Sequence, residues 1–180
     1  MEVNLGPIDR LGHEEKRKWL VSYLEPKGYE VFVETGTFQG ATVRAVKGMF
    51  DLVYSIELSD RYYEGVVKQF KDDHNVVLLH GDSADHLDVL MPELDCPCAF
   101  WLDAHYSGGR TARGETDTPI LRELKAISKH EHLLQDLILI DDAIDFGQGD
   151  YPYIYQVMAW AQSQGFDHFD CIDGIMRIYS

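Results

Sequence analysis

The chain has 180 residues, a formal net charge of −15 and a hydrophobic content of 45%. This length suits one domain with one core, and this hydrophobic content is typical of a globular fold rather than of a disordered chain. A chain with this much negative charge repels phosphate groups. We therefore do not expect nucleic acid as a partner. Its main basic run, Lys16-Arg17-Lys18, stands beside Glu14 and Glu15 and is interpreted as a solvated helix face.

The three cysteines and the N-terminal residues indicate a cellular setting. Cys96, Cys98 and Cys171 do not form the pattern of a disulfide framework, and Cys96 and Cys98 lack a second pair that would complete a zinc site. Reduced thiols are typical of the cytoplasm. The segment 1–10 lacks the apolar stretch of a signal peptide, and no run approaches the ~20 apolar residues of a membrane span. We therefore expect a cytoplasmic protein that has no membrane partner.

The predicted elements begin with an amphipathic helix over residues 12–25, which ends before Gly28. From residue 30 onwards, short apolar runs alternate with helix-length stretches, a pattern typical of buried parallel strands joined by helices. Near the C-terminus, two β-rich runs flank Asp173-Gly174, which predicts a two-residue hairpin turn. The predicted strands are residues 30–35, 52–57, 75–80, 98–103 and 136–141, and the predicted helices are residues 41–49, 61–71, 82–91, 119–132 and 151–163.

Each of the five apolar runs ends on, or is closely followed by, a carboxylate. These residues are Glu34, Glu57, Asp82, Asp103 and Asp141. In an open α/β sheet the ligand lies beyond the carboxyl ends of the strands. The sequence therefore predicts a row of negative charge along one functional edge, which should hold something cationic.

The first turn, residues 34–40, follows a strand and opens a helix, which is the position of a nucleotide-binding turn. Glu57 follows at the end of the second strand, where a carboxylate can accept bonds from both ribose hydroxyls. Thr37 stands near the position of the glycine that brings a dinucleotide turn against a pyrophosphate. Glu34 adds a negative charge that suits ammonium and sulfonium groups. The turn, with Gly36 and Gly40, therefore favours S-adenosylmethionine over NAD.

The third strand is followed by Asp82 and Ser83. Asp82 could bond the adenine amino group, with Ser83 beside it, or it could be a plain helix N-cap. Both interpretations stay open at this stage.

Asp103, Asp141 and Asp142 form a second group at the ends of the fourth and fifth strands. Converging carboxylates repel one another unless a cation lies between them, and hard oxygen ligands suit Mg²⁺ or Ca²⁺. The alternative is that Asp141 caps a loop and Asp142 faces solvent. His105, two residues after Asp103, is a candidate general base, or a loop histidine bonded to backbone.

The loop 106–118 has no periodicity and is long for a compact domain, which favours a functional role as a lid. Its Arg110 and Arg113 are available to an anionic acceptor. Further along, Tyr151, Tyr153 and Tyr155 alternate and are interpreted as packing residues, with an acceptor pocket as the alternative.

Together these motifs resemble the class I S-adenosylmethionine-dependent methyltransferases over residues 31–180. The likeness rests on Glu34-x-Gly36-x-x-x-Gly40, Glu57, Gly81-Asp82, Leu102-Asp103, Ile140-Asp141-Asp142 and the closing hairpin. Residues 33–36 and 140–142 resemble macrocin-type O-methyltransferases and, more distantly, catechol-type enzymes. The resemblance implies a Rossmann-like α/β fold with a seven-stranded, mostly parallel sheet, helices on both faces and an antiparallel last strand. It also implies one domain, residues 1–180, with residues 1–29 as an N-terminal helical cap.

The expected activity is S-adenosylmethionine-dependent methylation of an oxygen on a small molecule. A homodimer is compatible with this expectation. The cofactor-binding candidates are Glu34, Gly36, Thr37, Gly40, Glu57, Asp82, Ser83 and Asp103, and the catalytic candidates are His105 and Asp103. The resemblance implies that Asp103, Asp141 and Asp142 hold Mg²⁺. The alternatives are an NAD-dependent oxidoreductase and a cofactor-binding module without catalysis.

Overall fold

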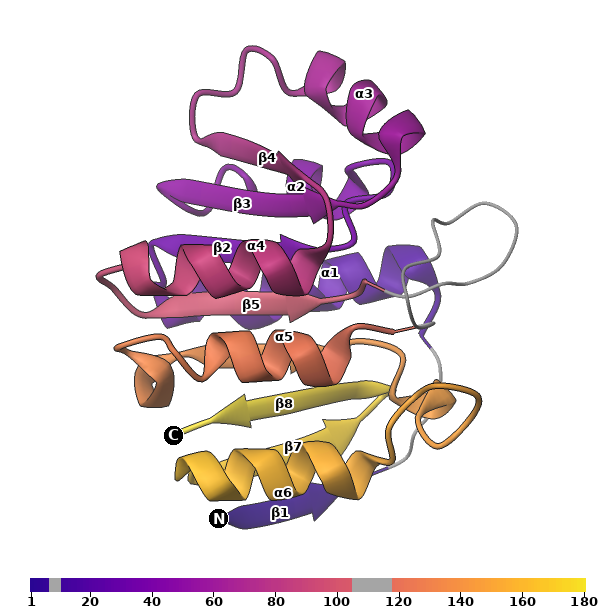
Figure 1. The fold of residues 1–180 in the computed structure, drawn as a ribbon, viewed down its shortest axis with the longest axis vertical. Helices are drawn as coiled ribbons and strands as arrows, with labels where there is room; N and C mark the ends of the chain where they lie inside the picture. The colour runs from indigo at the N-terminus through magenta and orange to yellow at the C-terminus, as the bar shows by residue number, and fades with distance from the viewer. Residues whose placement is uncertain (7–10, 105–117) are drawn as a thin grey trace.

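A computed structural model describes residues 1–6, 11–104 and 118–180 (Figure 1). An eight-stranded sheet of order β1-β7-β8-β6-β5-β2-β3-β4 forms its centre. The strands are β1 (Glu2–Leu5), β2 (Val31–Thr35), β3 (Leu52–Glu57), β4 (Val76–His80), β5 (Cys98–Leu102), β6 (Leu137–Ile140), β7 (His168–Ile172) and β8 (Ile175–Tyr179). All neighbours pair in parallel except β8, which is antiparallel to both β6 and β7. This is the Rossmann-like α/β class that the sequence predicts.

Helices cover both faces of the sheet. Figure 1 shows α4 (Ser83–Leu90), α5 (Ile120–Ile127) and α6 (Ile154–Gln164) in front of it, with α1 (His13–Leu24) and α2 (Ala41–Val46) behind. The buried side chains of α1, α2 and α3 (Asp60–Gln69) form one core cluster, and those of α4, α5 and α6 form the other. The described residues also contain four short 3₁₀ helices: η1 (Glu25–Lys27), η2 (Met91–Glu93), η3 (Leu133–Gln135) and η4 (Ala143–Asp145). No helix of the described segments is long and apolar enough to cross a membrane.

The predicted C-terminal hairpin is confirmed. Asp173 and Gly174 connect β7 to β8 with φ angles of 57° and 74°. A two-residue turn of type I′ requires positive φ at both central positions, and Asp-Gly satisfies this requirement. The hairpin places β8 beside β6, so that the end of β6 is fixed within the sheet.

The sheet has eight strands, where the sequence predicts seven. The additional strand is β1, which pairs in parallel with β7 at the sheet edge. All four of its residues are exposed, so they show none of the apolar pattern that marks a buried strand. Its strand conformation depends on backbone pairing with a distant segment. The segment predicted as a helical cap, residues 1–29, thus contributes an edge strand as well as α1.

The strand order reverses between β2 and β5. From β2 the chain continues through β3 and β4 towards one edge, and then returns to place β5 and β6 on the other side of β2. The helices that follow β2 and β5, which are α2 and α5, pack in different core clusters on the two faces of the sheet. This topological switch point is where an open α/β sheet binds its ligand.

Candidate functional site

The turn after β2 lies directly against the end of β5. Gly36 has a φ of 85°, and a Cβ atom on it would lie 2.6 Å from the carbonyl oxygen of Asp103. Its N–H donates to the carbonyl oxygen of Ile56 at 2.9 Å, which joins the turn to β3. Gly40, with a φ of 69°, packs so closely on Phe70 that a Cβ would lie 2.5 Å from its ring. The turn therefore needs glycine at both positions for positive φ and for close approach.

Glu57 fixes the other side of this turn. Its carboxylate accepts the Phe38 N–H at 2.7 Å through Oε2 and the Ser59 N–H at 2.8 Å through Oε1. Burial raises its pKa, and these backbone donors oppose the rise by stabilising the carboxylate. Phe38 itself has a φ of 48°. Glu57 therefore lies at the end of β3 as the sequence predicts, and it holds the conformation of the β2 turn.

Glu34 is almost completely buried at the end of β2. Its side chain accepts a hydrogen bond from Ser55 Oγ at 2.5 Å, and Ser55 Oγ lies 2.6 Å from Thr37 Oγ1. Burial raises the pKa of Glu34 to about 8, and the nearby Asp103 contributes in the same direction. A carboxyl with this pKa is largely protonated at neutral pH. A positive charge brought close to it would favour its ionised form.

Asp82 caps the start of α4. Its side chain accepts the Asp85 N–H at 3.2 Å, and its other oxygen pairs with Arg122 Nη1 at 2.9 Å. The N-cap interpretation of Asp82 is therefore confirmed, while its contact with adenine stays a prediction.

Ser83 is hydrogen-bonded to the carboxyl group of Glu123, which the sequence analysis does not identify as a site residue. Its Oγ donates to Glu123 Oε1 at 2.5 Å, and burial raises the pKa of Glu123 to about 7. A signal for Glu123 is present in the sequence, because it shares one helical face with Ile120, Leu124 and Ile127, all of which are buried. A carboxyl on the apolar stripe of a helix is a candidate for a buried polar contact.

The structure brings Asp103, Asp141 and Asp142 together. One carboxylate oxygen of each lies within 4.8 Å of the others. Asp142 has a φ of 52° and donates its N–H to Asp141 Oδ1 at 2.6 Å. Burial and the neighbouring carboxylates raise the pKa of Asp141. The predicted convergence at the ends of β5 and β6 is therefore present, and neither Asp141 nor Asp142 faces solvent.

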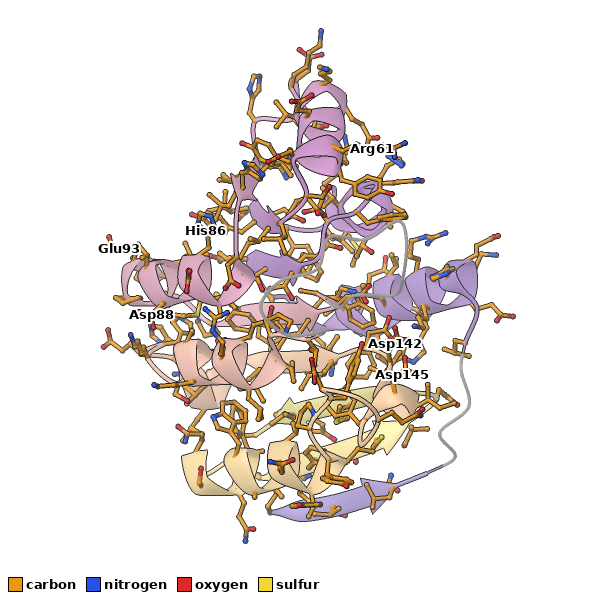
Figure 2. The ribbon with its side chains drawn as sticks, turned by 45° about the vertical axis from the view of Figure 1, so that its right-hand side comes forward. Arg61, His86, Asp88, Glu93, Asp142 and Asp145 are labelled. Carbon is orange, nitrogen blue, oxygen red and sulfur yellow. The ribbon has the colours of Figure 1, made fainter. Side chains whose placement is uncertain are left out.

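A lysine from the N-terminal helix meets two of these carboxylates. Lys16 Nζ lies 2.7 Å from Asp141 Oδ2 and 2.7 Å from Asp142 Oδ1. The lysine side chain is 8% exposed, so the interpretation of Lys16 as part of a solvated helix face is wrong. Lys18 does lie on that face, where it pairs with Glu14. In Figure 2, Asp142 lies at the end of the sheet beside α1, on the opposite side of the molecule from Glu93.

The arrangement of these carboxylates does not fit a divalent cation. Burial acts to lower the pKa of Lys16, but Asp141 and Asp142 raise it, and the net shift is upward. Lys16 is therefore an ammonium ion, and it lies within hydrogen-bond distance of the oxygens that Mg²⁺ would need. The ammonium of Lys16 therefore takes the place that a metal would need between Asp141 and Asp142.

A small pocket, partly open to solvent, lies beside this group. Its lining combines three carboxyl groups with apolar and aromatic side chains, among them Asp103, Glu123, Asp141, Phe146 and Tyr151. Tyr151 lines this pocket and also packs on Phe146, so both interpretations of it stay open, whereas Tyr153 and Tyr155 are exposed and stack on each other. His105, Arg110, Arg113 and the lid predicted over 106–118 (apart from Thr118) lie outside the described residues.

Comparison with solved structures identifies the fold. Over 94% of this chain and 79% of the other, it is similar to the S-adenosylhomocysteine-bound methyltransferase PaMTH1 of Podospora anserina, with a TM-score of 0.64 and 15% identity. It is also similar to TomG of Streptomyces achromogenes, an O-methyltransferase solved with S-adenosylmethionine, with a TM-score of 0.60 and 16% identity over 85% of this chain and 69% of TomG. The chain has the class I methyltransferase fold.

Other comparisons do not narrow this fold to one family. The 23S rRNA methyltransferase ErmE is similar as well, with a TM-score of 0.60 and 14% identity over 95% of this chain and 69% of ErmE. No protein-family model matches the chain, and no curated protein matches it. The class I methyltransferase fold is therefore shared with proteins that differ in what they methylate, and the substrate has to be argued from the site.

A second buried cluster lies at the opposite ends of the strands. His130 Nδ1 lies 2.6 Å from Asp136 Oδ2, and Cys98 donates its backbone N–H to Asp136 Oδ1 at 2.8 Å. Both side chains of the His130–Asp136 pair are fully buried. The ring of His130 therefore pairs with a buried carboxyl group. In the class I methyltransferase fold this cluster lies on the side away from the switch point.

Proposed function

We propose that this chain is an S-adenosylmethionine-dependent methyltransferase that methylates an oxygen of a small molecule. The observation that carries the proposal is the group of acids around the turn at the switch point: Glu34 and Glu57, both buried, lie on either side of Gly36, and the half-buried Asp103 places its backbone carbonyl against it. A pyrophosphate would meet carboxyl groups there, whereas a sulfonium and an ammonium group would be attracted by them. The likeness of the fold to methyltransferases supports the same cofactor.

Each acid has a proposed role in holding the cofactor. Glu34 and the backbone of 36–40, with Thr37 and Gly40, would hold the methionine part. Glu57 would accept from the ribose hydroxyls, because a carboxylate has lone pairs beyond those that Phe38 and Ser59 use. Asp82 and Ser83 would lie beside the adenine.

Methyl transfer would be an in-line displacement governed by positioning. The acceptor oxygen forms a bond to the methyl carbon while the bond from that carbon to sulfur breaks, which leaves S-adenosylhomocysteine. The hydroxyl proton of the acceptor passes to a base, for which we propose His105. Asp103 would help to orient the acceptor, and the pocket lined by Tyr151 and Phe146 would receive its apolar part.

A small acceptor is favoured over RNA by charge. The net charge of −15 opposes the approach of a phosphate backbone, even though proteins of similar fold include an rRNA methyltransferase. None of the three cysteines forms a disulfide, which supports the proposal of a cytoplasmic setting. Neither a membrane nor a nucleic-acid partner is part of this proposal, and a homodimer remains compatible with it.

Calorimetry with S-adenosylmethionine and S-adenosylhomocysteine tests the cofactor. We expect both to bind, and we expect Glu57→Gln to weaken binding at least about tenfold, because a hydrogen bond to a charged group contributes roughly 1.5–3 kcal/mol. Glu93→Gln is the matched control, since Glu93 is exposed at the other end of the sheet (Figure 2). Absence of binding at high micromolar concentration would remove the basis of the proposal.

Two further measurements separate the alternatives. A spectral change on addition of NADH, without binding of S-adenosylmethionine, would favour an oxidoreductase. Cofactor binding without turnover across a broad panel of hydroxylated acceptors would favour a module that binds the cofactor without catalysis.

A further inference from the structure

We propose that Lys16 serves as a built-in cation at the end of β6, so that its ammonium replaces the divalent metal that Asp103, Asp141 and Asp142 would otherwise bind. The role of Lys16 in methyl transfer rests on the proposed function, but its ion pairs with Asp141 and Asp142 do not.

The side chain of Lys16 bridges two carboxylates. Its Nζ lies 2.7 Å from one oxygen of Asp141 and 2.7 Å from one oxygen of Asp142. These are the short distances of charge-assisted hydrogen bonds. Lysine is almost never buried unless it is paired, and removing one partner of a buried pair leaves an uncompensated charge. Lys16 and the two carboxylates therefore depend on one another.

The backbone of both partners brings the charges together. Lys16 lies four residues before Leu20 and eight before Leu24, both of which are buried, so all three lie on the core-facing side of α1. On the other side, the left-handed conformation of Asp142 and its N–H bond to Asp141 Oδ1 fix two consecutive carboxylates. The position of the Lys16 ammonium is therefore set by the packing of α1 and by the bend of the chain after β6.

A divalent cation and this ammonium cannot share these oxygens. Mg²⁺ binds oxygen at about 2.0–2.1 Å in near-octahedral geometry, and a metal on Asp141 Oδ2 and Asp142 Oδ1 would occupy the space of Nζ. The remaining oxygen of Asp141 already accepts the Asp142 N–H at 2.6 Å. Both oxygens of Asp141 are therefore engaged by donors of the chain itself.

The consequence concerns how the acceptor is positioned. Asp141 and Asp103 line the pocket described above. With Lys16 as its counter-ion, Asp141 stays fixed without an added metal, so Lys16 is a positioning residue that acts through Asp141. Methyl transfer by this chain would then proceed in the presence of a chelator.

Titration with Mn²⁺, followed by electron paramagnetic resonance, tests whether Lys16 keeps a divalent metal from these carboxylates. The experiment needs neither cofactor nor acceptor. The proteins are the unmodified chain, Lys16→Met, and Lys18→Met as a control, because Lys18 is exposed on the same helix and pairs only with Glu14 among the described residues. We expect no Mn²⁺ binding by the unmodified chain or by Lys18→Met at micromolar concentrations. Lys16→Met uncovers the carboxylates and should bind Mn²⁺ at least tenfold more tightly.

Stability supplies a second readout if Lys16→Met folds poorly. We expect Mn²⁺ to raise the melting temperature of Lys16→Met and to leave that of the unmodified chain unchanged. The proposal is overturned if the unmodified chain binds Mn²⁺ at micromolar concentration and loses it in Asp141→Asn, or if Lys16→Met gains neither binding nor stabilisation. Failure of the proposed function would appear separately, as absence of S-adenosylhomocysteine binding with the Mn²⁺ results unchanged.

Discussion

Replacement of Gly36 by alanine should be among the most damaging single-methyl changes in this chain. Gly36 has a φ of 85°, and a Cβ there would lie 2.6 Å from the Asp103 carbonyl oxygen, 2.9 Å from its carbonyl carbon and 3.1 Å from the Ala104 Cα. All three are backbone atoms, so no side chain can move aside. The left-handed conformation costs about 1–2 kcal/mol for a residue with a Cβ, and forced overlap in a packed region costs roughly 1–3 kcal/mol more.

Two other glycines separate these contributions. Gly28 has a φ of 71° but open space around its Cβ position, so Gly28→Ala should cost only the conformational part, about 1–2 kcal/mol. Gly48 has open space and no left-handed φ, so Gly48→Ala should change stability by no more than about 1 kcal/mol and can be stabilising. Urea unfolding measures all three free energies of unfolding.

The same series tests the site as well as the fold. Because Gly36→Ala forces β2 and β5 apart at the switch point, we expect it to abolish S-adenosylhomocysteine binding under conditions where the protein is still folded. Gly28→Ala should bind as the unmodified chain does. If Gly36→Ala loses no more stability than Gly28→Ala, the close approach of the turn to Asp103 is not a constraint and the reasoning is refuted.

Three other changes follow from the buried polar groups. Burial raises the pKa of Glu34 to about 8, so the folded state keeps a proton that the unfolded chain releases, and the free energy of unfolding falls as pH rises from about 4.5 through 8. Glu34→Gln should therefore gain roughly 2–3 kcal/mol relative to the unmodified chain between pH 5 and 7.5, and parallel pH profiles would contradict this. Asp136→Ala leaves the Cys98 N–H and the His130 ring without their partner and should cost at least about 3 kcal/mol in urea unfolding; a loss under 1 kcal/mol would show that water replaces these bonds. Asp82→Ala removes an N-cap and should cost about 1 kcal/mol, with Asp82→Asn restoring most of it; equal losses in both variants would mean that the pairing with Arg122, rather than the cap, carries the effect.

The sheet and the hairpin could be predicted because their signals are local. Each of the five parallel strands from β2 to β6 is a short apolar run that ends near a carboxylate, although β4, at the sheet edge, is only partly buried, and Asp173-Gly174 has the composition of its turn. The strand β1 could not be predicted, because its residues are exposed and its pairing with β7 joins segments more than 160 residues apart. An edge strand of this kind is defined by its partner rather than by its own composition.

The acidic edge was also predictable, but its cation was not. The carboxylates after β5 and β6 follow from the topology, since parallel strands end at one edge. The burial of Lys16 depends on Asp141 and Asp142, which lie 125 and 126 residues away. In a local sequence of Lys, Arg and Glu, exposure is the favoured state, because burying an ammonium is costly without a partner. Only the folded chain supplies that partner.

The two halves of the acidic edge are therefore neutralised in different ways, and the difference bears on where a cationic cofactor would bind. At the end of β6, Asp141 and Asp142 are compensated by the ammonium of Lys16. At the end of β2, Glu34 is compensated by its own proton, because its pKa is raised to about 8, and its hydrogen bond comes from the neutral hydroxyl of Ser55. A proton can leave when a permanent cation arrives, whereas a lysine fixed by packing cannot. A sulfonium group would thus find its attraction at β2, and its binding near pH 7 should release protons, which calorimetry in buffers of different ionisation enthalpy would detect. Binding of S-adenosylmethionine without proton release would place its charge away from Glu34.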